Sequence, residues 1–468
     1  MATTPKLHNR FISDDLTAPH DFDVYEHTGF MPRRPPIHRL PPEWETWETV
    51  MQDAMRRKLK LGNRADVAEA DRQESESWHA TVREVPLLSI DELKMSDILL
   101  HRAHHVLTHI LHFYVHSMPL SDPIIIPKSI GVPLLQVLKT LETPPVLAYS
   151  DIVLYNWTIN ESASAENPHS PIPTPENICV QSQFTDTEDE AVFYLTSAKI
   201  ELAGAAALQL IQNTLEESLS DPGDTSSLHR IARNTVQLSV VLADLTVRLL
   251  AVRDGCDPEV FYHKIQPWIS GQDGTRKWVF EGASEAGFQA PEELVGATAG
   301  QSSLIPAIDN FLGVHGHHYA DNYEIPTPPA STPTPSPKPL FLKRMELYMS
   351  RPHRLCLEHI SETSRMRSIV IQHADNTELR EAYNNALRAL RAFRDAHLRI
   401  VALYIVGPAR RISAGLRANA HNVQMVGEGT GGDGLKGTGG TDLMPFLKGL
   451  RDKTTEAEIC RQEKSEGS

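Results

Sequence analysis

One stretch near the C-terminal end of the chain, residues 378–406, constrains the fold more than any other. Its sequence, ELREAYNNALRALRAFRDAHLRIVALYIV, predicts a single helix of about eight turns. The Asp-Asn-Thr at 375–377 offers side-chain oxygens that can cap the first turn. The Gly-Pro pair at 407–408 predicts the end of the helix.

One face of this helix forms an apolar seam with a single polar member. The seam residues recur at alternating spacings of four and three: Leu379, Tyr383, Ala386, Leu390, Phe393, His397, Ile400 and Tyr404. The arginines lie off this face: Arg380, Arg388, Arg391, Arg394 and Arg399. A buried imidazole must find a partner for each ring nitrogen, or its burial costs free energy. The helix leaves two interpretations of His397 open: an axial ligand to a metal or haem, and a core histidine bonded to a backbone carbonyl.

Composition limits the compartment and the partners of the chain. A length of 468 residues with 40% hydrophobic residues allows two or three compact domains. The net charge of −15 argues against general nucleic-acid binding and against an anionic membrane surface. The four cysteines lie far apart, which suits a reducing compartment rather than a disulfide framework. Since neither a secretory signal nor an uninterrupted membrane span is evident, we expect a soluble, cytoplasmic protein.

Proline-rich segments divide the chain, and most of the remainder has helical periodicity. The fold class that we predict is therefore mainly α. The predicted parts are an irregular arm (1–40), a small, mainly helical or mixed domain (41–175), a large all-α domain (185–406) with a Pro-rich loop (325–340), a flexible Gly-rich segment (407–440), and a C-terminal helix and tail (441–468). Within the large domain, residues 226–255 are apolar around much of the helix circumference, which predicts a central position in the bundle.

Five histidines recur every three or four residues in a predicted helix of the small domain: His101, His105, His109, His112 and His116. This spacing places imidazoles on one side of a helix and is compatible with a metal-binding face. No carboxylate or cysteine completes a ligand set, so we favour a solvated or packing face.

Seven phrases, in a fixed order over about 300 residues, carry a resemblance to a known family. They are PPVLAYSDIVLYNW (144–157), FYLTSAKIELAGAAA (193–207), FYHKIQPWISG (261–271), GATAGQSSLIPAIDNFLG (296–313), RPHRLCL (351–357), LRAFRDAHLRIVALYI (390–405) and GTGGTDLM (437–444). With these phrases the chain resembles the indoleamine 2,3-dioxygenase family, haem enzymes that open the indole ring of tryptophan with dioxygen. The phrases AGQSS, RxxH and GTGGTDLM, found together, are specific to this family.

The resemblance implies a small mixed α/β domain over a large all-helical domain that holds haem b. It implies insertion of O2 across the indole C2–C3 bond of tryptophan or a related indoleamine, with N-formylkynurenine-type products. This reaction belongs to tryptophan catabolism through the kynurenine pathway, which leads to NAD. The expected partners are a small indole substrate and O2, with no nucleic acid and no membrane, and the expected form is a monomer.

The resemblance also implies roles for individual residues. His397 matches the proximal ligand of the haem iron, Arg394 matches an arginine that pairs with a haem propionate, and Asp309 matches an acidic residue near both. The residues that match the substrate pocket and the wall above the iron are Tyr149, Ile152, Val153, Phe193, Tyr194, Ser197, Phe261, Ala297, Thr298, Ala299 and, in a lid segment, Thr438. None is expected to act as an acid or base, because the protein supplies orientation, a dry pocket and the axial ligand.

One position departs from the family pattern. Members with tryptophan activity carry an arginine that binds the substrate carboxylate, five residues after the pocket phenylalanine. Counted from Phe261, this substrate-binding position is Gln266. Loss of a charged bidentate contact is expected to cost roughly 1.5–3 kcal/mol of binding free energy. His263, if protonated, is a partial replacement for the arginine.

Three hypotheses follow from this departure. The first, which we favour, is a dioxygenase with weak tryptophan affinity or with an indole substrate that lacks a free carboxylate. The second is a haem-binding pseudoenzyme or sensor with the same fold. The third is a helical interaction protein without haem, in which the histidines are structural.

Overall fold

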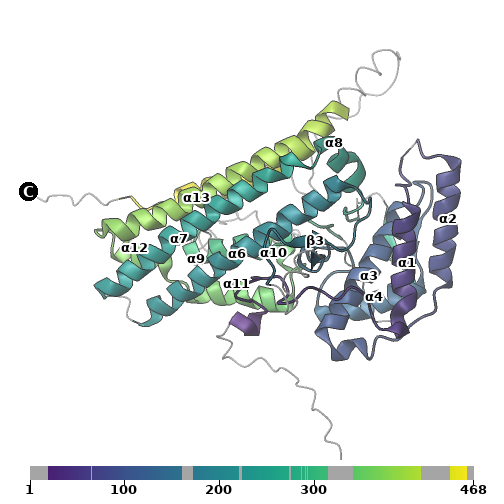
Figure 1. The fold of residues 1–468 in the computed structure, drawn as a ribbon, viewed down its shortest axis with the longest axis horizontal. Coiled ribbons are helices and arrows are strands. Elements are labelled where there is room, and N and C mark those ends of the chain that lie inside the picture. The colour runs from purple at the N-terminus through teal and green to yellow at the C-terminus, as the bar shows by residue number, and fades with distance from the viewer. Residues whose placement is uncertain are drawn as a thin grey trace, which may run out of the picture.

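Helices dominate the protein. The computed structural model describes residues 19–460 except residues 65, 161–171, 221–223, 273–275, 286, 290, 292, 315–340 and 413–442. Figure 1 shows helices α1 to α4 grouped at one end of the molecule, while the long helices α6, α7 and α13 run beside one another along the rest. This arrangement confirms the predicted mainly α fold class.

The group at one end is built around helix α3 (Asp97–His116), most of whose residues are buried. It packs against α1 (Glu45–Arg57) and α4 (Lys128–Leu141), and α2 (Glu69–Glu84) covers α1 and α4. The α3 helix begins where the Ser96 hydroxyl accepts a hydrogen bond from the Leu99 backbone N–H.

Four short strands form two pairs. Strand β1 (Ile124–Ile126) pairs in parallel with β4 (Trp278–Phe280), and β2 (Trp157–Ile159) pairs antiparallel with β3 (Ile178–Val180). Strand β4 lies in the range for which the sequence predicts only helices, and it packs with the α3 end of the molecule. Three residues carry no periodic signal of their own, so only the distant partner strand defines β4 as a strand.

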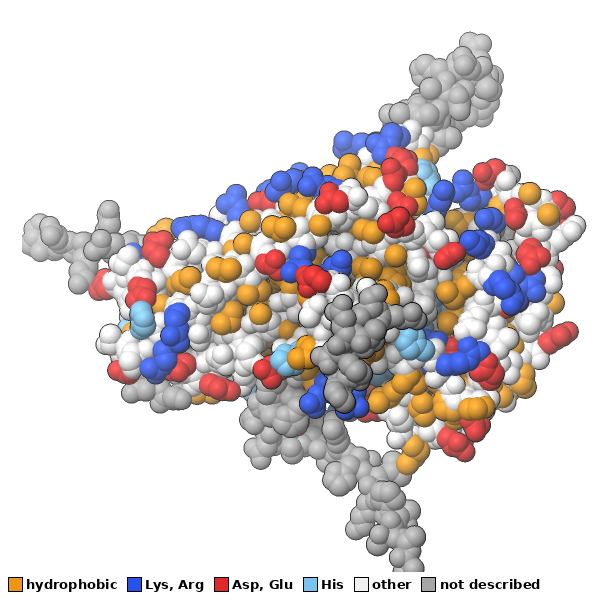
Figure 2. Space-filling model, viewed as in Figure 1, with side chains coloured by type: hydrophobic (Ala, Val, Ile, Leu, Met, Phe, Trp, Pro, Cys, Tyr) orange, Lys and Arg blue, Asp and Glu red, His pale blue; other side chains and the backbone are white. Residues whose placement is uncertain are grey.

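The long helices form the second part of the molecule. They are α6 (Glu188–Ser220), α7 (Thr225–Leu250) and α13 (Thr377–Val401), and α7 packs against both others. The Asn376 side chain caps α13 by accepting a hydrogen bond from the Leu379 N–H at 3.1 Å. Apolar seam residues of α13 are buried as predicted, but two of the five arginines, Arg380 and Arg394, are buried as well. Figure 2 shows Lys and Arg side chains along the edge of the molecule where α13 runs.

Helix α7 packs against both α6 and α13, but it is not covered on all sides, as the central position predicted from its sequence would require. Val236, Val240 and Val247 are exposed on one side, and Figure 2 shows hydrophobic side chains on the surface of the long helices. Helices α6 and α7 are each long and apolar enough to cross a membrane by length and composition alone. That criterion is also met by core helices of soluble proteins, and both helices here pack within the bundle.

The predicted end of the helix that carries His397 is wrong. A π-helical turn, η8 (Ala402–Val406), follows α13, and residues 407–412 continue as helix. A π turn contains one additional residue and interrupts the regular hydrogen-bond ladder. Pro408 therefore lacks a donor at a point where the ladder is already broken, and Gly-Pro does not end the helix.

Two more π turns lie in the segments that the family resemblance assigns to the substrate pocket. These are η4 (Ser150–Leu154) and η6 (Phe261–Ile265). The remaining helical elements are η1 (Pro19–Phe22), η2 (Pro42–Trp44), η3 (Leu93–Met95), η5 (Ala251–Asp254), α8 (Pro258–Val260), η7 (Ala299–Gln301), α9 (Leu304–Leu312), α10 (Phe341–Glu346), α11 (Arg351–Thr363), α12 (Met366–Gln372) and α15 (Leu443–Glu456).

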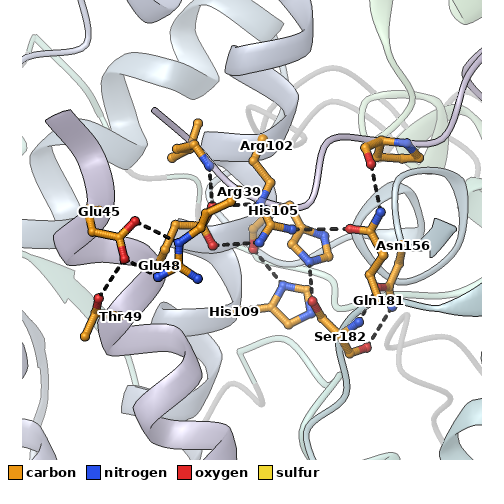
Figure 3. A network of polar contacts seen from close by, with 12 residues as sticks. Arg39, Glu45, Glu48, Thr49, Arg102, His105, His109, Asn156, Gln181 and Ser182 are labelled. Atoms are coloured by element: carbon orange, nitrogen blue, oxygen red, sulfur yellow. Dashed lines mark hydrogen bonds and ion pairs between the residues drawn. The ribbon is translucent and has the colours of Figure 1, made fainter. Parts of the chain in front are cut away.

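A buried polar network joins the N-terminal arm to α1 and α3 (Figure 3). The Arg102 guanidinium donates to both carboxylate oxygens of Glu48 at 2.8 and 2.6 Å, and the Leu40 N–H donates to Glu48 at 2.8 Å. In the same network, a ring nitrogen of His105 lies 2.9 Å from the Ser182 hydroxyl. The arm that the sequence predicts as irregular is therefore held by specific contacts, at Leu40 by α1 and at Pro36 by Gln181, the residue after β3.

The α3 histidines form a packing face. His105, His109 and His112 are buried, and His101 and His116 are half-buried. No group of three or more His, Cys, Asp or Glu side chains suited to a metal ion occurs among the described residues. Their ring nitrogens bond to backbone and hydroxyl groups instead, which favours the packing interpretation over the metal-binding one.

Candidate functional site

His397 lies on α13 where the apolar core is interrupted. Phe393, one turn before it, belongs to the core between α6, α7, α9 and α13, while Ile400, one turn after it, belongs to a separate cluster around Phe261. Neither ring nitrogen of His397 is hydrogen-bonded to any described residue, and the side chain remains partly accessible. The core-histidine interpretation requires a backbone carbonyl partner, and the described part of the chain provides none.

The protonation state of His397 suits a ligand. Burial, together with the nearby Arg394 guanidinium, lowers its pKa to about 4. The imidazole is therefore neutral near pH 7 and keeps a lone pair available for a metal.

Arg394 lies one turn before His397 and is held by two other helices. Its Nη2 donates to both carboxylate oxygens of Asp309, on α9, at 2.7 and 2.6 Å. Its Nη1 donates to the hydroxyl of Thr454, on α15. All three side chains are buried. The structure thus brings together the pair that the sequence assigns to the haem edge, and it adds Thr454, which the sequence analysis missed.

These residues fit a haem better than a metal ion held by protein ligands alone. His397 belongs to no cluster of metal-binding side chains among the described residues, so a bound iron would need a macrocycle to supply its other ligands. The Nε–H of Arg394 has no partner among the described residues and is left for an anionic group such as a propionate.

An aromatic wall extends along the seam of α13 beyond His397. The ring centroids of Phe193, on α6, and Phe261, on η6, are 4.4 Å apart. Phe261 also packs edge-on against Tyr404, a seam residue on η8, at 5.7 Å. Tyr194, the next residue on α6, is buried on the side of the α3 end of the molecule. Two of the expected pocket aromatics are therefore in contact with each other and with the helix that carries His397.

Tyr149, Ile152 and Val153 lie together in and beside the π turn η4, and all three are buried. The Tyr149 backbone N–H donates to Gln301 at 2.8 Å, and its phenol donates to Glu201, on α6, at 2.8 Å. Burial and the Glu201 carboxyl hold the pKa of Tyr149 well above its usual range, while hydrogen bonds with Ser302 and Ser197 oppose this shift. Ser197 and Tyr149, far apart in sequence, are therefore neighbours.

The loop at 296–303 closes against the segment that follows η6. Its residues differ in exposure: Ala297 is buried, Thr298 is half-buried and Ala299 is exposed. Thr298 caps the short helix η7. The Ala297 N–H donates to the Ile269 carbonyl at 3.0 Å. A Cβ on Gly296 would lie 2.2 Å from this carbonyl oxygen, so only glycine permits the two segments to approach so closely.

His112 connects two of the pocket segments. Its Nδ1 donates to the Trp268 carbonyl at 2.7 Å, and its Nε2 accepts from the Leu147 N–H at 3.0 Å. These partners require a neutral ring with the proton on Nδ1. Leu147 lies two residues before Tyr149, and Trp268 lies two residues after Gln266. The histidine face of α3 thus holds the pocket segments in place, a role that the periodicity of the histidines did not indicate.

Gln266 directly follows η6, and the π turn changes its direction relative to Phe261. Its N–H donates to the Phe261 carbonyl at 2.8 Å across five residues, the bond that defines a π turn. In an α-helix, residues five apart would point about 140° away from each other. The Gln266 side chain is half-exposed and has no hydrogen-bond partner among the described residues.

His263 is not a replacement for the family arginine in this structure. Its Nε2 lies 3.2 Å from a Glu259 carboxylate oxygen, and the Arg411 guanidinium binds the same carboxylate. Thr438, the expected lid residue, lies outside the described residues, as do residues 413–440 of the predicted Gly-rich segment.

Sequence reasoning missed Glu201, Gln301 and Ser302, which hold Tyr149. One signal was present: Glu201 is the only carboxylate in the phrase FYLTSAKIELAGAAA, whose other members are mostly apolar or small. A lone acidic residue in such a helix marks a buried carboxyl that needs partners.

Comparison with known proteins finds one family throughout. A family model described as indoleamine 2,3-dioxygenase matches residues 18–457. Indoleamine 2,3-dioxygenase of Saccharomyces cerevisiae is 28% identical in an alignment of 480 positions that covers 99% of each chain. Indoleamine 2,3-dioxygenase acdA of Aspergillus candidus is 29% identical, over 93% of this chain and 96% of the relative. Indoleamine 2,3-dioxygenase 1 of Rattus norvegicus is 28% identical, over 93% and 95% respectively.

Proposed function

Because this chain belongs to the indoleamine 2,3-dioxygenase family, we propose that His397 is the proximal ligand of its haem and that the indole pocket lies beside Phe193 and Phe261. Family membership makes the protein a haem-dependent oxidoreductase that cleaves the indole ring of tryptophan or a related indoleamine. It also argues against the hypothesis of an interaction protein without haem. The observation that carries the assignment of His397 is a partly accessible imidazole on a core seam with no partner for either nitrogen among the described residues.

Each group in the site then has a physical role. Haem, when bound, supplies the dioxygen chemistry. Arg394, fixed by Asp309, holds a propionate and aligns the haem edge with the helix that carries His397. The remaining pocket side chains, Tyr149, Ile152, Val153, Tyr194, Ser197, Ala297, Thr298 and Ala299, together with Thr438, orient the indole and exclude water.

Gln266 bears on the substrate class. Its amide can donate a hydrogen bond to a carboxylate, but it has neither charge nor the two parallel donors of arginine. We infer either weak tryptophan affinity or an indoleamine substrate without a free carboxylate. The same observation favours a second candidate, a haem sensor that has lost tryptophan turnover.

The cellular setting is also a proposal. We infer a cytoplasmic monomer that acts in tryptophan catabolism through the kynurenine pathway toward NAD, without nucleic-acid or membrane partners. The net charge of −15 and the four separate cysteines support this setting. Size-exclusion chromatography with light scattering tests the monomer.

Haem reconstitution tests the proposal. We expect the wild-type protein to gain a Soret band. In His397→Ala, the haem spectrum should lose the features that come from histidine as an axial ligand. The control is His229→Ala, at an exposed histidine of α7, and its spectrum should match that of the wild type. Anaerobic reduction, followed by O2 and tryptophan or tryptamine, with product absorbance recorded, then distinguishes dioxygenase from sensor. An unchanged spectrum in His397→Ala would contradict the ligand assignment, and haem binding without turnover of either substrate would favour the sensor.

A further inference from the structure

Glu201 is a buried carboxyl at the junction of three segments of the proposed pocket. It lies on α6, one turn after Ser197, and is 1% exposed. The Tyr149 phenol donates to its Oε1 at 2.8 Å, and the Ser302 hydroxyl donates to the same atom at 2.6 Å. One oxygen atom therefore joins α6, the segment before η4 and the loop at 296–303.

The second oxygen of this carboxyl is unusual. Glu201 Oε2 is buried and has no hydrogen-bond partner among the described residues. No cation among the described residues contributes to its environment, and burial raises the pKa of the carboxyl against the two donated hydrogen bonds. An uncompensated buried charge is costly, so the site favours the neutral carboxylic acid. A group of this kind needs an explanation beyond stability, since an apolar residue would avoid the penalty.

The partners of Glu201 indicate what the carboxyl does. Tyr149 is held at two points: its backbone N–H by Gln301, in the loop at 296–303, and its phenol by Glu201, on α6. Ser302, bound to the same Oε1, follows Gln301 directly. The phenol also lies in hydrogen-bonding range of Ser197 on α6. With both ends of Tyr149 fixed, the ring cannot change rotamer without breaking a buried hydrogen bond.

We propose that Glu201 is a positioning residue of the indole pocket: its Oε1 fixes the Tyr149 phenol and the Ser302 loop, and thereby sets the shape of the pocket wall. The inference rests on the proposed function, in which Tyr149 lines the pocket. It requires an acceptor at Oε1 rather than a negative charge, and this requirement separates a positioning role from general electrostatics.

Two substitutions at this position test the requirement. Glu201→Gln keeps an oxygen that accepts from both hydroxyls, whereas Glu201→Leu removes the acceptor that the two hydroxyls share. We expect Glu201→Leu to raise KM for tryptophan about tenfold, with kcat and the Soret band within about twofold of wild type. Rescue by Glu201→Gln should return KM to within about threefold. Gln209→Leu, at an exposed position on the same helix, is the control.

A double-mutant comparison keeps the test informative if Glu201→Leu does not fold. Tyr149→Phe combined with Ser302→Ala removes both donors, so this background no longer needs an acceptor, and adding Glu201→Leu to it should leave KM unchanged. Tyr149→Phe alone should raise KM in the same direction as Glu201→Leu. A wild-type KM in Glu201→Leu or in Tyr149→Phe, or an equal loss of kcat and haem content, would overturn the positioning role. A wild-type protein without a Soret band would instead contradict the proposed function itself.

Discussion

The Arg394 guanidinium nitrogen Nη2 donates to both carboxylate oxygens of Asp309, at 2.7 and 2.6 Å, and both side chains are buried. The two residues are far apart in the sequence and come from α13 and α9. Since Arg394 precedes His397 by one turn, this ion pair joins α13 to α9 close to His397. It also keeps the guanidinium at a fixed position and leaves its Nε–H available.

Removing Asp309 should therefore be costly. Asp309→Leu leaves the Arg394 charge buried without its partner, which is expected to lower the free energy of unfolding by about 3–5 kcal/mol. The control is Arg391→Gln on the same helix, whose exposed contact with Asp395 spans 3.8 Å and contributes less than about 1 kcal/mol. Urea unfolding of both variants, with and without haem, checks the difference. Equal losses of unfolding free energy in the two variants would show that the buried pair stabilises the fold no more than the exposed one.

Restoring the family arginine at Gln266 should act on one substrate only. Gln266→Arg adds a charged, bidentate donor beside Phe261, and we expect KM for tryptophan to fall roughly ten- to a hundredfold. Tryptamine, which has no carboxylate, should gain nothing. The control is Lys264→Arg, which keeps the charge at an exposed position of η6. Steady-state kinetics with both substrates measures the two KM values. An equal fall in KM for tryptamine would contradict a carboxylate contact.

His112 should affect both stability and substrate binding. His112→Phe leaves the Leu147 N–H and the Trp268 carbonyl without their partner, each at a cost of about 1–3 kcal/mol if water cannot enter. Because these groups lie beside Tyr149 and Gln266, KM for tryptophan should rise as well. Chemical denaturation and steady-state kinetics measure the two effects. His263→Gln, whose contact with Glu259 is solvent-accessible, should leave stability within about 0.5 kcal/mol.

Buried histidines should make the protein sensitive to acid. Burial lowers the pKa of His109 to about 4, from the ordinary histidine value of 6.5. A histidine whose folded pKa is depressed contributes stability that is fully present above pH 6.5 and is lost as the pH falls toward 4. The loss is on the order of 3 kcal/mol for this residue. His353, with its pKa also lowered to about 4 by burial, adds a loss in the same window.

Denaturation curves at pH 7.5, 6 and 5 check this dependence. His109→Gln should flatten it, because the amide does not titrate, although the loss of packing against Phe184 lowers stability at every pH. His229→Gln, at an exposed position, should leave the slope unchanged. A wild-type unfolding free energy that stays constant from pH 7.5 to 5 would contradict the prediction.

The accuracy of the sequence-based predictions follows the range of the interactions involved. Local spacing predicted α13 and its seam correctly, because an amphipathic helix is defined by residues three and four positions apart. The same reasoning failed at β4, which needs a partner more than a hundred residues away, and at α7, whose exposed side includes Val236, Val240 and Val247. It also failed at Gly407 and Pro408, where a π turn changes the register before the proline.

The sequence by itself determined the helical class, the buried seam with one histidine, and the order of phrases by which the chain joins its family. It also determined the position of Gln266, because that residue is found by counting along one segment. Only the tertiary structure decided the partners: Asp309 for Arg394, Glu201 for Tyr149, and two backbone segments for His112. These contacts join residues dozens to more than a hundred positions apart, and no local pattern specifies which buried polar groups will meet when the helices pack.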